Sequence, residues 1–224
     1  MNADDFGQCD GINRGILAAH ERGVVTSASL MVRWDAASDA SQAAERAGLP
    51  LGLHIDLGEW RFKRGEWSPV YEVVDLDDET AVAAEVGRQV DAFAELTGRR
   101  PAHIDSHQHV HRRQSVGRAV TAAAEQLGST VRDSDPRVTY CGGFYGQTPE
   151  GSPLRDAISV DSLLGIIGAL PVGITELGCH PGFDVEIDTM YRTERAQEVA
   201  TLCDHRVRAA LEAQRIRLCS FEEL

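Results

Sequence analysis

The sequence lacks any long apolar run. No stretch approaches the roughly 18 uncharged apolar residues that a membrane-spanning helix needs. The N-terminus also lacks the basic and apolar regions of a signal peptide. These absences predict a soluble, cytoplasmic protein that does not insert into a membrane.

Positive charge is scarce, with 22 basic against 35 acidic residues and a formal net charge of -13. A surface of this sign repels a phosphate backbone, so nucleic acid is not expected as a partner. Cysteine is limited to five residues with no CxxC spacing, which argues against a disulfide framework and a cysteine zinc knuckle. We interpret the cysteines as reduced, small hydrophobic residues: Cys9, Cys141, Cys179, Cys203 and Cys219.

A low-complexity segment, a short-period repeat and an obvious linker are also missing, so residues 1–224 are expected to form one domain. Apolar runs alternate with helical patterns, which predicts an α/β fold with parallel strands and right-handed crossovers. Strands are expected at 24–32, 51–57, 102–107, 130–134, 172–179 and 216–221, and helices from about 35 to 48 and over 77–98. A polar loop with Trp60 and Trp67 and an irregular loop over 136–153 are expected between them.

The first βα turn lacks the G-x-G-x-x-G pattern of a dinucleotide-binding sheet. Its sequence, "DDFGQCDG", puts acidic residues where that fold binds phosphate, which favours a barrel over an open sheet. In barrels the chemistry gathers at the C-terminal ends of the strands. The polar residues expected there are Asp4, Asp5, His54, His103, His107, His109, His111, Arg132, Glu176 and His180.

The clustered histidines indicate a metal ion. Imidazole and carboxylate ligands together suit zinc and also accept manganese, cobalt, nickel or magnesium. In "HIDSHQHVH", His107, His109 and His111 share one face of an extended segment. They span roughly 13 Å, too far for all three to bind one ion at about 2 Å, so one or at most two can be ligands. His103 lies early in its strand and fits a buried, hydrogen-bonded histidine better.

The adjacent carboxylates Asp4 and Asp5 are expected to play different roles, because neighbouring residues that leave a strand diverge. One can bind the metal while the other stays ionised beside it and takes a proton from water. The alternative role, capping the helix near Gly11, suits Asp10 better. A cysteine nucleophile at Cys179 is disfavoured, because its neighbour His180 points to the opposite face of the strand.

These segments together resemble the YdjC family of carbohydrate deacetylases, over residues 2 to about 200: "NADDFG", "GINRGILAAHERGVVTSASLMV", "LGLHIDL", "PAHIDSHQHVH" and "TELGCHPG". The resemblance implies a distorted TIM-like (β/α) barrel of about seven strands. It also implies metal-dependent removal of an acetyl group from an N-acetylated sugar, such as an N-acetylglucosamine oligosaccharide. The implied cofactor is one divalent ion, magnesium first and zinc or another transition metal as alternatives, held by Asp5, His54 and His107. Asp4 would be the general base and, by similarity to polysaccharide deacetylases, His180 the acid.

Several other residues are candidates for contacts with the sugar. Arg132 either orients Asp4, binds the sugar or is a surface cation, and His109 and Glu176 are further candidates. Trp60 and Trp67 offer a flat apolar face to a pyranose ring, or mark an oligomer contact.

Two features depart from the family pattern. Only Met1 to Ala3 precede Asp4, where family members carry several apolar residues, so the first strand is expected to be truncated. An open strand edge there could be covered in a homodimer. Arg33 and Trp34 stand where smaller or uncharged residues are expected, with consequences for the shape of the pocket.

Two other functions stay open. One is another metal-dependent hydrolase that uses "HQHVH" as a paired-histidine zinc motif. The other is a noncatalytic carbohydrate-binding or metal-binding protein of the same fold.

Overall fold

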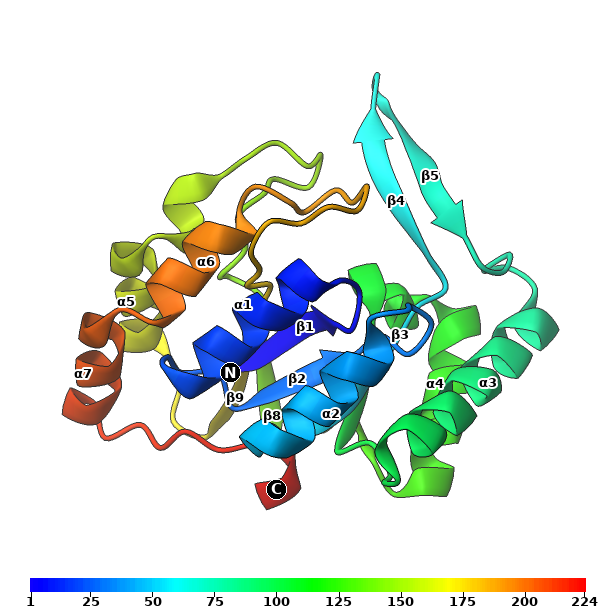
Figure 1. Ribbon diagram of the computed structural model, residues 1–224, viewed down its shortest axis with the longest axis horizontal. Helices are drawn as coiled ribbons and strands as arrows, with labels where there is room; N and C mark the ends of the chain where they lie inside the picture. The colour runs from blue at the N-terminus through cyan, green and yellow to red at the C-terminus, as the bar shows by residue number, and fades with distance from the viewer.

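The computed structural model describes residues 1–224, which form a parallel sheet of seven strands in the order β7-β6-β3-β2-β1-β9-β8. Figure 1 shows the helices arranged around this sheet. β7 and β8 form its two edges, so the barrel is open between them. The fold is therefore α/β, a distorted TIM-like barrel, as predicted. The strands are β1 (Asn2–Phe6), β2 (Ser27–Leu30), β3 (Leu51–Ile55), β6 (His103–Ser106), β7 (Thr130–Val131), β8 (Val138–Cys141) and β9 (Ile174–Cys179).

Helix ends follow the local sequence. Gly48, Gly98 and Gly128 end three helices in the left-handed conformation, which glycine adopts without a steric penalty. None of the helices has the length and apolar character needed to cross a membrane. The helices are α1 (Asp10–Glu21), α2 (Ala37–Ala47), α3 (Glu79–Thr97), α4 (Gln114–Leu127), α5 (Val160–Ala169), α6 (Arg195–Leu202) and α7 (His205–Ala213), with short 3-10 helices η1 (His107–Arg112), η2 (Arg155–Ile158) and η3 (Phe221–Glu223).

β1 lies inside the sheet, with β2 on one side and β9 on the other. Its five residues are all buried, and the edge expected at a truncated first strand is not there. Between Ala3 and Phe6 the register with β2 shifts, and Asp5 has a positive φ of 68°. This is a β-bulge, which re-aims side chains beside a site. Neither carboxylate caps α1, and Asp10, the residue expected to do so, is the first residue of the helix rather than its cap. The N-cap is Cys9, whose side chain accepts no capping hydrogen bond.

The segment with Trp60 and Trp67 is not the predicted loop but an antiparallel hairpin, β4 (Gly58–Lys63) and β5 (Glu66–Glu72). It projects from the barrel in Figure 1. Two residues connect the strands, Arg64 with φ 57° and Gly65 with φ 90°. A two-residue turn with both φ values positive matches the right-handed twist of a hairpin. The glycine in "KRGE" was the signal that could have predicted it.

One predicted loop and one predicted strand were wrong. The segment 136–153, expected to be irregular, contains β8, which pairs with β9. The segment 216–221 forms no strand and leads into η3. The two errors are connected, because β8 already occupies the side of β9 that β1 leaves free. Ile216 and Leu218 instead pack against the core as partly buried residues.

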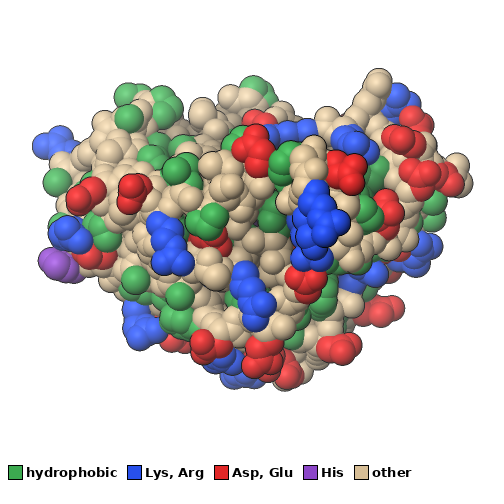
Figure 2. Space-filling view, turned by 90° about the horizontal axis from the view of Figure 1, so that it is seen from above, with side chains coloured by type: hydrophobic (Ala, Val, Ile, Leu, Met, Phe, Trp, Pro, Cys, Tyr) green, Lys and Arg blue, Asp and Glu red, His purple; other side chains and the backbone are tan.

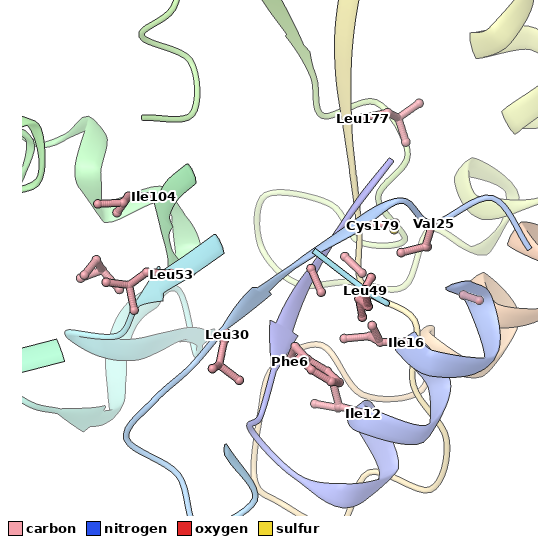
Figure 3. Close-up of a cluster of buried hydrophobic side chains, with 14 of the residues drawn as sticks. Phe6, Ile12, Ile16, Val25, Leu30, Leu49, Leu53, Ile104, Leu177 and Cys179 are labelled. Atoms are coloured by element: carbon pink, nitrogen blue, oxygen red, sulfur yellow. The ribbon is translucent and has the colours of Figure 1, made fainter. Parts of the chain in front are cut away.

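The core lies between the sheet and the helices, and Figure 3 shows Phe6 of β1 with Ile12 and Ile16 of α1. At Gly15 the chain beyond β9 approaches so closely that a Cβ would lie 2.3 Å from the Cα of Gly182. Only glycine permits this contact, which holds the segment after β9 against α1. Figure 2 shows acidic and basic side chains interspersed on the face seen from above, so the net negative charge forms no single patch there.

Candidate functional site

A cleft of about 810 Å³ lies where the predicted polar residues gather. Its wall includes residues of β1, β3, the η1 turn and the end of β9, together with the β4–β5 hairpin. Six of the predicted residues line it: Asp4, Asp5, His54, His107, His109 and His180. The side chains of Arg33 and Trp34 do not line the cleft. Both donate hydrogen bonds to Asp56, away from the cleft, so they do not narrow it.

Asp5, His54 and His107 come together at the base of the cleft. One ligand atom from each lies within 4.8 Å of the others. Asp5 Oδ1 is 3.3 Å from His54 Nε2 and 3.0 Å from His107 Nδ1. These are the three residues expected to hold the metal, and they come from β1, β3 and the η1 turn.

Each histidine of this cluster has a second carboxylate at its other nitrogen. His54 Nδ1 lies 2.7 Å from Asp105 Oδ1, and His107 Nε2 lies 3.4 Å from Glu59 Oε2. Burial alone lowers the pKa of His54, but Asp105 and then Asp5 raise it to about 9. In the same way Asp5 and Glu59 outweigh burial and raise the pKa of His107 well above its usual value. The cluster therefore favours positive charge.

Two buried arginines hold the carboxylates of β1. Arg195 Nη2 donates to Asp5 Oδ2 at 2.6 Å, leaving Oδ1 toward the histidines. Arg132 donates to both oxygens of Asp4 at 2.7 Å and also contacts Asp105 and Glu176, each at 2.7 Å. Burial raises the pKa of Asp4 and Asp5, but Arg132 and Arg195 respectively bring each below its usual value.

Arg132 is fully buried, so it is not a surface cation. Its guanidinium holds both carboxylate oxygens of Asp4, which agrees with the expectation that Arg132 orients Asp4. Neither Arg132 nor Glu176 lines the cleft, because both side chains are engaged with each other behind its wall. The structure therefore places them away from the sugar contacts that the sequence suggested.

The remaining histidines of "HIDSHQHVH" separate. His109 lines the cleft, with Nε2 3.2 Å from the Tyr140 hydroxyl. His111 instead pairs with Ser106 at 2.7 Å. His103 is fully buried beside Ser29 Oγ at 2.9 Å, which confirms its interpretation as a buried, hydrogen-bonded histidine.

His180 stands at the end of β9 on the Asp4 side of the cleft. Its Nε2 lies 3.8 Å from Asp4 Oδ2, and its backbone N–H donates to the buried Glu198. Burial lowers the pKa of His180 to about 4, so the ring is neutral at pH 7. The neighbouring Cys179 is buried outside the cleft, its thiol donates to the Asn2 carbonyl and burial raises its pKa, so it is no nucleophile.

Four residues of the site were missed from the sequence: Glu59, Asp105, Arg195 and Glu198. A signal existed for Asp105, because the period of two puts it on the same strand face as His103 and His107. Arg195 and Glu198 lie on α6, outside every motif. Arg195 contacts Asp5, 190 residues away in the sequence, and Glu198 accepts from the backbone of His180, 18 residues away.

Comparison with known proteins identifies the chain's relatives. The family model for YdjC-like protein matches residues 1–213. A carbohydrate deacetylase of Brevibacillus brevis is 31% identical over 100% of this chain and 98% of its own length. A chitooligosaccharide deacetylase of Serratia marcescens is 30% identical with the same coverage. The crystal structure of a putative cellobiose-phosphate cleavage protein from Enterococcus faecalis superimposes with a TM-score of 0.78 at 26% identity, covering 99% of this chain and 96% of the other. The chain belongs to the YdjC-like protein family.

Proposed function

We propose that this protein is a metal-dependent deacetylase that hydrolyses the acetamide of an N-acetylated sugar. The observation that carries the proposal is the convergence of Asp5, His54 and His107 beside the arginine-bound Asp4 in one cleft. Two relatives, a carbohydrate deacetylase and a chitooligosaccharide deacetylase, support this reaction and this substrate class.

The residues of the cluster fit a divalent ion. Two ligands each about 2.1 Å from one ion lie about 3.0–3.4 Å apart in octahedral or tetrahedral geometry. The 3.0 and 3.3 Å separations around Asp5 Oδ1 fall in this range. Asp5, His54 and His107 would hold the ion, and this mixed donor set accepts magnesium as well as zinc or another transition metal. When bound, the ion would polarise the acetyl carbonyl and lower the pKa of a water molecule.

Asp4 is the general base of the proposed reaction. Its Oδ1 accepts bonds from Arg132 and Asn2, whereas Oδ2 accepts only one, from Arg132. A carboxylate oxygen has two lone pairs, so Oδ2 keeps one for the proton of the attacking water. Arg132 keeps Asp4 ionised and holds its orientation.

His180 carries the proton to the leaving amine. Because its ring is neutral at rest, it must first receive a proton. Asp4 Oδ2 lies 3.8 Å from His180 Nε2 and can supply this proton once Asp4 has taken one from water. The proton taken from water by Asp4 then passes to His180, which donates it to the departing nitrogen. This order of proton transfers replaces the expectation that His180, as the acid, is already protonated before the reaction.

The experiment is acetate release from diacetylchitobiose and longer N-acetylglucosamine oligomers, with and without a chelator. Asp4→Asn is expected to lower kcat about 10²- to 10⁴-fold, the usual contribution of a general base. Asp10→Asn, a matched change at an exposed residue outside the cleft, should retain full activity. Failure of the metal-loaded wild type to release acetate from every N-acetyl sugar, while it cleaves another amide or an ester, would refute the deacetylase. Sugar binding without any hydrolysis would support the noncatalytic alternative.

A further inference from the structure

Glu59 is a buried carboxylate for which the proposed reaction has no role. It lies in β4, at the base of the hairpin, and is 1% exposed. Its Oε1 accepts hydrogen bonds from Thr189 Oγ1 at 2.9 Å and from the Met190 N–H at 2.6 Å. Its Oε2 has no hydrogen-bond partner and lies 3.4 Å from His107 Nε2, which also lacks one. One oxygen is thus anchored while the other faces the histidine.

The two histidines of the cluster are arranged alike. In each, one nitrogen faces Asp5 Oδ1 and the other faces a buried carboxylate, Asp105 for His54 and Glu59 for His107. A carboxylate accepts hydrogen bonds but donates none, so each carboxylate favours a proton on the nitrogen that it faces. An ion bound on the Asp5 side displaces the proton there, while Asp105 or Glu59 keeps the other proton on the outer nitrogen, so the bare nitrogen is the one oriented toward the ion.

A second contact ties the same turn to the hairpin. The side chain of Gln108, next to His107, accepts from the Trp60 N–H at 2.9 Å and donates to the Trp60 carbonyl at 2.7 Å. Gln108 adopts a φ of 50°, a conformation that non-glycine residues rarely take and that must be held by its surroundings. Adjacent residues of β4 therefore hold adjacent residues of the η1 turn.

We propose that Glu59 is a positioning residue that fixes His107 with Nδ1 toward Asp5, so that the hairpin sets the affinity of the site for a divalent cation. The inference rests on the proposed function, because it takes Asp5, His54 and His107 as the ligands. Glu59 also connects the site, through its hydrogen bonds with Thr189 and Met190, to the segment after β9, which reaches toward β4 in Figure 1.

The test measures binding of Co²⁺ to the ion-free full-length chain by calorimetry and by visible absorption. In Glu59→Gln the amide can keep its carbonyl toward Thr189 and Met190, so its NH₂ faces His107 Nε2. An NH₂ donor requires that nitrogen to be bare, which moves the ring proton to Nδ1, the atom aimed at the ion. Loss of such an outer partner typically weakens metal binding about 10- to 100-fold. We expect this loss together with a changed Co²⁺ absorption spectrum at saturation.

Glu66→Gln is the matched control, because it makes the same chemical change on the same hairpin at an exposed position outside the cleft. It should bind Co²⁺ as the wild type does. Glu59→Asp keeps the charge but shortens the side chain, and it should also weaken Co²⁺ binding. It replaces Glu59→Gln as the test variant if Glu59→Gln does not fold. The spectrum separates positioning from simple destabilisation, since a structural defect alone would leave the ligand field of bound Co²⁺ unchanged.

The outcomes distinguish the two proposals. If the wild type binds Co²⁺ and a folded Glu59 variant binds it within about twofold with the same spectrum, the role of Glu59 is refuted and the ligand set stands. If the wild type and Glu66→Gln bind no Co²⁺, Mg²⁺ or Zn²⁺, the ligand set itself is refuted, and the role of Glu59 with it.

Discussion

Binding of a divalent ion to this site should release protons, and the number follows from the geometry. In the ion-free protein burial lowers the pKa of His54, but Asp105 and Asp5 raise it to about 9, and Asp5 and Glu59 raise that of His107 well above its usual value. Both rings are then protonated at pH 7, whereas an ion binds only the bare nitrogen. Asp5 is already ionised because Arg195 and His107 overcome its burial. Binding therefore expels two protons, one from each histidine.

The release of two protons sets the sign and the size of the pH dependence of ion affinity. Protons compete with the ion, so the apparent affinity rises with pH and levels off once both rings are neutral. Two released protons mean about a 100-fold gain in affinity per pH unit, or about a thousandfold between pH 6.0 and 7.5. Each released proton changes the binding free energy of the ion by about 1.4 kcal/mol per pH unit. A site with unperturbed histidines would show most of its change below about pH 6.5.

The assay is calorimetric titration with Co²⁺ across this pH range, repeated in buffers of different ionisation enthalpy so that released protons are counted directly. Asp105→Asn is the informative variant, because removal of the main charge that raises the pKa of His54 should bring release at pH 7 toward one proton. Release of fewer than about half a proton by the wild type at pH 7 would show that the rings are neutral in the free protein. The electrostatic reasoning for the cluster would then be refuted.

Three further predictions concern residues around the cluster. Arg132→Met leaves three buried carboxylates without their cation and should lower the free energy of unfolding, measured in urea, by about 3–5 kcal/mol. Arg118→Met, the control, breaks an exposed pair with Glu79 and should lower it by under about 1 kcal/mol. Equal losses would contradict the role of Arg132. His180→Ala should lower kcat about 10²- to 10⁴-fold with unchanged Co²⁺ affinity, and an equal loss of affinity would make His180 a ligand. Burial lowers the pKa of His103 to about 4, so the neutral ring stabilises the fold above pH 6.5. This contribution, about 3 kcal/mol, is lost as the pH falls toward 4. Urea unfolding of His103→Gln should lack this loss, and a pH profile like that of the wild type would contradict the role of His103.

The sequence predicted the composition of the cleft better than its geometry. The alternation of strands and helices put Asp5, His54, His107 and His180 at one end of a barrel, and all four line the cleft. Different roles for Asp4 and Asp5 were also predicted, but from the divergence of neighbouring side chains, a premise that does not hold. Neighbouring residues on a regular strand point to opposite faces, whereas the bulge at Asp5 brings both carboxylates to the same cleft. No residue pattern indicated that bulge, because Asp5 is not a glycine.

The residues that fix the cluster in place were the hardest to predict, and the reason is physical. A parallel sheet aligns the ends of its strands, so strand-borne groups can be placed from sequence alone. Arg195 acts across 190 residues from a helix, and it reaches Asp5 because the segment after β9 packs against α1 at the contact between Gly15 and Gly182. Glu59 reaches His107 because the base of the hairpin lies against the η1 turn, where the backbone of Trp60 is bonded to the side chain of Gln108. Such contacts depend on how whole elements pack, and the periodicity of any one segment carries no information about its partner.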